Sequence, residues 1–187
     1  MSNLPIFLKY TIIALISMVP IVELRGAIPI AESLDLNVFI YYPVAIIGNM
    51  LPVPFIYLFA RKILEWGKDK KFTGKFFTWC LQKGEKGGKK MKEKAGKTGT
   101  FLALLLFVAI PIPGTGAWVG TLAASLLNIG FKASIIAVTL GVLIAGIIMS
   151  VGSILVSNLG IPALIGIVVA IVAILVIYLF IKNKKKK

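Results

Sequence analysis

Residues 101–127 read FLALLLFVAIPIPGTGAWVGTLAASLL, two apolar segments separated by the turn Pro111–Gly116. As helices, the segments 101–110 and 117–127 would each rise about 15–16 Å. The hydrocarbon core of a bilayer is roughly 30 Å thick, so neither segment can cross it alone. Prolines and glycines in the turn remove backbone donors and favour a sharp reversal of the chain. The block is therefore either one broken span or a re-entrant hairpin that returns to the side it entered from.

The whole chain is as apolar as this block and poor in charge. Of its 187 residues, 58% are hydrophobic and 15% are charged, with a mean hydropathy of +0.96, whereas about a quarter of the residues in a soluble domain are charged. This composition predicts a single all-α integral membrane domain. Histidine is absent and Cys80 is the one cysteine, so we expect no disulfide, no metal site, no cofactor and no enzyme activity. The N-terminal block lacks the features of a signal peptide.

The net charge of +14 is concentrated in two places. Thirteen basic residues lie between Arg61 and Lys97, and five lie in the tail 182–187. Basic clusters beside apolar segments follow the positive-inside rule, which makes both clusters cytoplasmic. No nucleic-acid recognition module is visible, so this charge indicates topology and no nucleic-acid partner. Aromatic residues among the bases indicate a helix at the membrane interface, while the part 84–97, rich in glycine and lysine, is expected to be mobile or a solvated linker.

Counting the crossings favours the hairpin over the broken span. An even number of crossings must separate two cytoplasmic clusters, and the apolar run that ends at Ile181 is long enough for two spans that divide at the turn residues 157–162. The expected order is a first re-entrant hairpin at 1–35, a span at 36–60, a basic cytoplasmic interfacial loop at 61–97, a second hairpin at 98–128, spans at 131–157 and 161–181, and a basic cytoplasmic tail at 182–187.

The two hairpins would belong to an internal repeat. A shift of 91 residues pairs Pro20 with Pro111, and both windows run from a proline turn to an asparagine and a long apolar segment. The first hairpin would turn around Pro20–Pro29 and enter from outside, so the two copies are inverted. The predicted fold has two inverted repeats, each a re-entrant helical hairpin plus a transmembrane helix, with a further C-terminal transmembrane helix, as in many secondary transporters. The alternative is that 4–22 is a plain span with the N-terminus inside.

Charged residues in the first turn are the main candidates for function. Glu23 and Arg25 lie in an apolar segment, where each ionisable residue costs about 2.5–3.5 kcal/mol on insertion scales. A carboxylate beside a cation can bind or release a proton, and an arginine can instead hold an anionic head group. The structural alternative is an ion pair that only pins the hairpin tip. Glu32 and Asp35 are accessory candidates, expected at the outer interface.

The second turn carries no charge but would place two half-helix ends at one point. Their unpaired N–H and C=O groups can coordinate a substrate or an ion. Asn49 could bridge helices or line a path, and Trp118 could stack on an amphiphile or pack in the core. The predicted substrate or proton site comprises Glu23, Arg25, Pro29, Asn49, Pro111, Pro113, Gly114, Thr115, Gly116 and Trp118.

The two turns resemble the small multidrug export protein family. The similar motifs are Glu23–Pro29, Gly48-Asn49 and Val108–Trp118, within roughly residues 5–155. More distantly, this family resembles the DedA and SNARE-associated Golgi membrane proteins. The resemblance implies two opposed re-entrant hairpins, movement of an amphiphile such as polyprenyl phosphate across the bilayer, and roles for residues of the first turn. The DedA pattern also carries arginines around its second hairpin, and this chain has none there.

These observations predict a multi-pass protein of the cytoplasmic membrane, a secondary transporter that moves a small amphiphile or lipid. The alternatives are an exporter of cationic drugs and a non-transporting scaffold whose basic loop binds anionic lipids or a partner. Membrane lipids and an amphiphilic substrate are the expected partners, with proton coupling and a homodimer as open alternatives. Small residues four apart, Gly141/Ala145 and Gly146/Ser150, favour close helix packing, either within the fold or in such a dimer.

Overall fold

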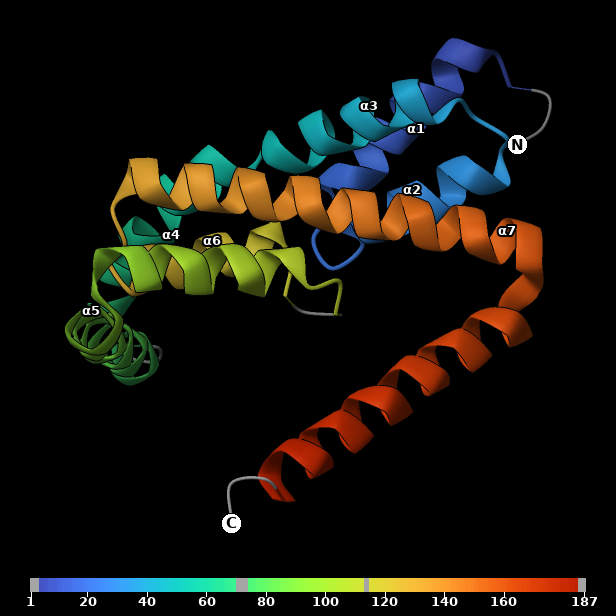
Figure 1. Ribbon diagram of the computed structural model, residues 1–187. Coiled ribbons are helices and arrows are strands. Elements are labelled where there is room, and N and C mark those ends of the chain that lie inside the picture. Colours follow the sequence, from blue (N-terminus) through green and yellow to red (C-terminus); the bar gives the residue numbers. More distant parts are fainter. Residues whose placement is uncertain (1–3, 70–73, 113–114, 185–187) are drawn as a thin grey trace. The chain divides into compact units, whose positions relative to one another are not determined.

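The computed structural model describes residues 4–69, 74–112 and 115–184, and every regular element in these ranges is a helix (Figure 1). The prediction of an all-α protein is confirmed for this part of the chain. The chain divides into two units, Met1–Ser150 and Val151–Lys187. The elements are α1 (Ile6–Met18), α2 (Glu23–Ser33), α3 (Val38–Met50), α4 (Val53–Lys68), α5 (Gly74–Ala109), α6 (Ala117–Leu126) and α7 (Phe131–Lys184).

Helices α1 and α2 form a pair joined by the short connection 19–22, around the predicted Pro20 turn. Helix α1 ends at Met18 because the residue before a proline is driven out of the helical region, and Val19 is extended at φ −72° and ψ 128°. Ile21 and Glu23 have positive φ, which completes the reversal. With 13 and 11 residues, the two helices rise about 20 and 16 Å. Neither helix reaches the length of a typical span, and both the first re-entrant hairpin and the plain span at 4–22 stay predictions.

The next apolar block carries the predicted proline break. Asn37 caps α3, since its side-chain oxygen accepts from the Phe39 N–H at 2.9 Å. Helices α3 and α4 then meet around Pro52, which has no N–H to donate. Together they form a candidate membrane span that continues to Lys68, beyond the predicted end at residue 60. Only 28% of its most apolar window is buried, which is typical of a helix that faces lipid.

The described part of the basic stretch 61–97 is helical except for the turn at Asp69 and the kink at Gly96. Helix α5 runs through 84–97 to a kink at Gly96, where φ is +64°. The segment 84–97 is therefore helical and not an irregular linker, although most of its side chains are exposed to solvent. Its glycines serve close packing instead: a Cβ added at Gly84 would lie 2.7 Å from the Leu126 carbonyl oxygen, and one added at Gly88 would overlap the Leu127 carbonyl. The intervening lysines are good helix formers.

The second short pair consists of the part of α5 after Gly96 and helix α6, which pack against each other. Helix α6 has 10 residues and rises about 15 Å. Helix α7 is regular from Phe131 to Gly160, where φ is +77°. This break falls where the sequence predicts the division between two spans, and 131–158 is the second candidate span. Helix α7 continues through the predicted span 161–181, and residues 185–187 of the tail lie outside the described residues.

Small residues of α7 are buried inside the first unit. A Cβ added at Gly141 would lie 2.7 Å from Cβ of Val108, and one at Gly146 would lie 2.8 Å from the Tyr42 ring. Ala145 and Ser150 are buried as well. These four positions therefore serve packing within the fold, and a homodimer stays a prediction.

Gly141→Leu should destabilise the first unit, because overpacking a tight helix contact costs about 1–3 kcal/mol. We expect a lower midpoint of thermal unfolding in detergent. Gly152→Leu is the matched control on the same helix, since nothing lies within 4 Å of a Cβ at Gly152. Equal midpoints for the two variants would contradict the packing described above.

Candidate functional site

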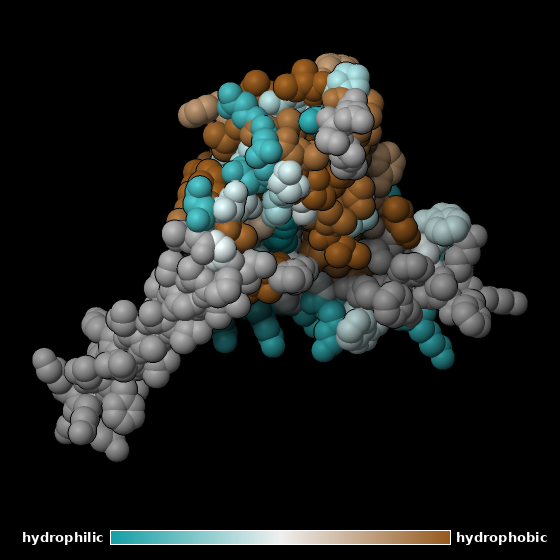
Figure 2. All heavy atoms as spheres, turned by 90° about the vertical axis from the view of Figure 1, so that its right-hand side faces the viewer, coloured by the Kyte–Doolittle hydropathy of each residue, from teal (hydrophilic) through white to brown (hydrophobic). Residues whose placement is uncertain are grey.

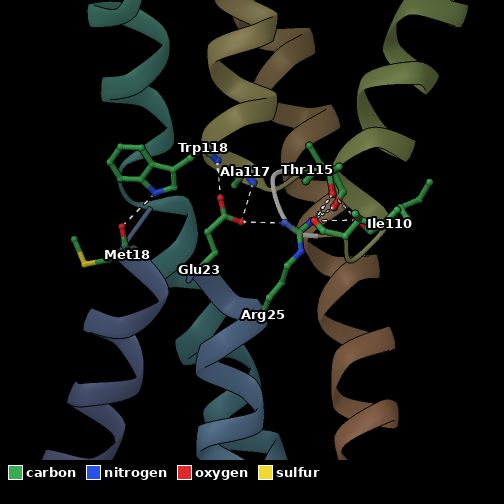
Figure 3. Close-up of polar contacts among 9 residues, drawn as sticks. Met18, Glu23, Arg25, Ile110, Thr115, Ala117 and Trp118 are labelled. Atoms are coloured by element: carbon green, nitrogen blue, oxygen red, sulfur yellow. Dashed lines mark hydrogen bonds and ion pairs between the residues drawn. The ribbon is translucent and has the colours of Figure 1, made fainter. Parts of the chain in front are cut away.

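Glu23 is the first residue of α2, and its side chain ends at the N-terminus of α6 (Figure 3). Its Oε2 accepts from the Ala117 N–H at 3.1 Å and its Oε1 accepts from the Trp118 N–H at 3.0 Å. The residue is 2% exposed. The first N–H groups of a helix have no partner within the helix and carry partial positive charge. The carboxylate of the first turn therefore caps a helix of the second pair.

Gly116 makes room for this carboxylate. It precedes α6 as the capping residue, with φ −75°, a value open to any residue. A Cβ added at Gly116 would overlap the Glu23 carboxylate. Glycine is therefore required at this position by the close approach of the acid, and its backbone conformation does not demand it.

Arg25 holds the other helix end of the second pair. Its Nη2 donates to the carbonyl oxygens of Ile110 at 3.0 Å and Val108 at 3.3 Å, at the C-terminal end of α5. The same nitrogen donates to Thr115 Oγ1 at 3.0 Å. Thr115 has one hydroxyl hydrogen to share between the carbonyls of Ile110 at 2.7 Å and Ile112 at 2.8 Å. Carbonyls at a helix C-terminus carry partial negative charge, so a guanidinium is stabilised there.

The two charges also contact each other. Arg25 Nη1 lies 3.7 Å from Glu23 Oε2, and both side chains are largely buried, at 11% and 3% exposed. Each charge thus faces an opposite charge and a helix end of opposite polarity. The structural alternative of a simple pinning pair understates this arrangement, because the pair satisfies the two unpaired helix ends of the uncharged turn. Arg25 Nε is buried with no hydrogen-bond partner among the described residues, so one donor remains for a ligand or water.

Trp118, which follows the second turn, also contacts the first helix pair. Its indole Nε1 donates to the Met18 carbonyl at 3.2 Å, at the end of α1 (Figure 3). The side chain is half-buried, so it packs between the two pairs and also makes a polar contact. Three interrupted helices, α1, α5 and α6, therefore have their ends satisfied at one place.

The structure separates the accessory acids from this cluster. Glu32 is half-buried and accepts from the Tyr41 hydroxyl at 2.8 Å, while Asp35 is exposed with φ +53°. Pro29 lies inside α2 with its ring exposed; because it has no N–H, the Arg25 carbonyl lacks its usual helical partner. Pro111 is half-buried. The predicted site residues Pro113 and Gly114 lie outside the described residues.

Further polar side chains among the described residues are buried without a hydrogen-bond partner. Asn49 is fully buried, and neither its amide oxygen nor its amide nitrogen has a hydrogen-bond partner among the described residues. The same holds for the hydroxyls of Ser17 and Thr121. The sequence singled out Asn49 but not these two hydroxyls, because a lone hydroxyl in an apolar helix commonly bonds its own backbone. Within 4–69, 74–112 and 115–184, no group of three metal-ligating side chains is present.

The apolar helices and the buried charged cluster define a helical membrane protein whose interrupted helices meet at a polar site. Residues 23–148 match the family described as "Putative small multi-drug export protein". This match covers more than half of the chain, so the chain belongs to that family, and the resemblance seen in the two turns is confirmed. The description of the family indicates an export protein. Comparison with curated proteins and with solved structures gives no match, and the more distant DedA resemblance stays a prediction.

Gly116→Ala should disrupt the cluster by displacing the Glu23 carboxylate from α6. The buried N–H of Ala117 and the partly buried N–H of Trp118 then lose their acceptor, which costs about 1–3 kcal/mol. We expect a lower midpoint of unfolding in detergent for this variant. Gly130→Ala is the control, because nothing lies within 4 Å of a Cβ there. A Gly116→Ala protein as stable as that control would show that the carboxylate is not held as described.

Proposed function

We propose that the protein is a secondary transporter in which Glu23 and Arg25 lock two helix turns together and release them as the substrate passes. One observation carries this proposal. The only charges in the first turn sit on the unpaired helix ends of the second turn, at 3.0–3.3 Å. A contact of this kind can hold a barrier closed and can also be exchanged for contacts to a ligand.

The short helix pairs support a re-entrant placement in the bilayer. Helices α1, α2 and α6 are each too short to cross a core of roughly 30 Å. Helices α1 and α6 expose apolar side chains, as at Phe7, which is 79% exposed, and Val119, at 41%. In this proposal the first pair enters from outside and the second from the cytoplasm, so the two turns meet near mid-depth. The two copies are then inverted relative to each other. An outward-open and an inward-open state can therefore form when the two repeats exchange conformations.

Proton binding to Glu23 is the proposed trigger. The ionised carboxylate is a strong acceptor for the N–H groups of Ala117 and Trp118. Protonation removes its negative charge and so weakens these two hydrogen bonds. The freed helix N-terminus is an anion-binding site. Arg25 lies beside it and can bind a phosphate or carboxylate through its fork of donors. The substrate class that fits is therefore an anionic amphiphile, such as a lipid or polyprenyl phosphate.

Export of cationic drugs is the second candidate, favoured by the family description. Here Glu23 would attract the cation, while Arg25 remains occupied by the carbonyls of Val108 and Ile110. The two candidates differ in the charge of the molecule that moves. A scaffold without transport activity is the third reading, and it requires neither charge.

Glu23→Gln should reduce proton-driven transport at least about tenfold in proteoliposomes, since the variant keeps the side-chain size but cannot titrate. The probes are a phosphate-headed amphiphile and a cationic dye, each tested with an imposed pH gradient. Glu32→Gln is the matched control, because Glu32 contacts Tyr41 outside the cluster. Arg25→Lys, which keeps the charge but loses the fork, should impair movement of the phosphate-headed probe.

Movement of the dye alone, dependent on Glu23 but not on Arg25, would favour the drug exporter. Wild-type rates in both Glu23→Gln and Arg25→Lys would overturn the proposed mechanism. If the folded wild-type protein moves neither probe, the remaining interpretation is a scaffold without transport activity.

A further inference from the structure

The part of α5 before its kink presents lysines to the surface. Hydrophilic side chains project from below the hydrophobic part of the first unit (Figure 2). The exposed lysines of this part are Lys75, Lys83, Lys86, Lys89, Lys90, Lys92 and Lys94. Glu85 and Glu93 oppose them, and Glu85 is already paired with Arg61 at 2.7 Å. The surface therefore carries a strong excess of positive charge.

The orientation of this helix is fixed by its glycine side. Gly84 and Gly88 lie against the backbone at the C-terminal end of α6, and Lys92 Nζ donates to the Asn128 carbonyl at 2.8 Å. These three positions are four residues apart, so they share one side of the helix. That side of the helix packs against the C-terminal end of α6 and the residues that follow it.

A second side of the same helix remains open. Lys83, Lys86, Lys90 and Lys94 recur at spacings of three and four residues, which places them in one stripe. At about 100° of rotation per residue, this stripe lies roughly a third of a turn from Gly84. All four side chains are exposed.

An apolar groove opens beside the stripe. It has a volume of about 290 Å³ and is lined by Trp79, Lys83, Gly84, Ala123, Leu126 and Leu127. A second apolar groove of about 310 Å³ shares the lining residues Ala123 and Leu127. Both are near the lower limit for small-ligand pockets, about 300 Å³, so together they suit an extended chain better than a compact ligand. Lys83 is the charged residue at the rim of the first groove.

We propose that the groove between α5 and α6 is a binding site for an anionic phospholipid. The phosphate binds Lys83 and its stripe neighbours Lys86 and Lys90, and an acyl chain lies over Ala123 and Leu127. The argument is charge complementarity next to an apolar groove in a membrane protein, which matches the two halves of such a lipid. Trp79, 57% exposed, stands at the same rim, where amphipathic aromatic rings are favoured at a membrane surface. This site does not depend on the proposed transport.

Native mass spectrometry of the full chain in detergent tests the site with two probes, phosphatidylglycerol and phosphatidylcholine of the same acyl chains. We expect the first molecule of phosphatidylglycerol that binds to have an affinity at least about fivefold higher than the first molecule of phosphatidylcholine. The triple variant Lys83→Gln/Lys86→Gln/Lys90→Gln should lose this preference. The control Lys62→Gln/Lys68→Gln/Lys132→Gln removes the same charge from exposed positions outside α5 and should keep it.

A second pair of variants tests the groove separately from the charge. Ala123→Phe fills the shared lining and should weaken phosphatidylglycerol binding about fivefold or more. Leu122→Phe adds similar bulk at an exposed neighbour on the same helix and should leave binding unchanged. Equal affinities of the wild type for the two lipids would overturn the proposal. The remaining explanation for the exposed lysines would then be binding of an acidic protein partner. An equal loss of preference in both triple variants, or unchanged binding by Ala123→Phe, would also overturn it.

Discussion

The rest of the structure depends on how interrupted helices satisfy their ends away from water. A helix that stops inside an apolar environment leaves N–H and C=O groups without partners, and each costs several kcal/mol there. This chain stops three helices at one place. Glu23 accepts from the start of α6, Arg25 donates to the end of α5, and the Trp118 indole donates to the end of α1. Two charges that would be costly alone are stabilised because each meets a helix end of opposite polarity.

The turns and helix breaks could be predicted from the sequence, because prolines and glycines determine the backbone conformation at their own positions. The Pro20 and Pro111 turns, the break at Pro52 and the division near Gly160 follow from missing donors and positive φ, and all appear in the structure. The charges of the first turn stood out for the same local reason, since ions are rare in apolar segments. Which groups they bind could not be predicted, because most of the partners are backbone atoms, which leave no mark in composition, and lie some ninety residues away.

For the segment 84–97, the local sequence pattern suggested a linker, whereas the structure has a helix. Glycines among lysines are typical of a flexible linker, because glycine weakens a helix by roughly 0.5–1 kcal/mol relative to alanine. Here Gly84 and Gly88 lie where the backbone of α6 leaves no room for a side chain. The tertiary contact that requires glycine also restores the helix, and only the three-dimensional structure distinguishes the two roles.

Helix α6 is clasped at both ends, by Glu23 at its start and by the glycine side of α5 at its finish. Ten residues of regular helix make a segment about 15 Å long. If the proposed lipid site and the proposed transport mechanism both hold, this one helix joins them, so a lipid bound at the lysines of α5 would act on the contact that holds the Glu23 carboxylate.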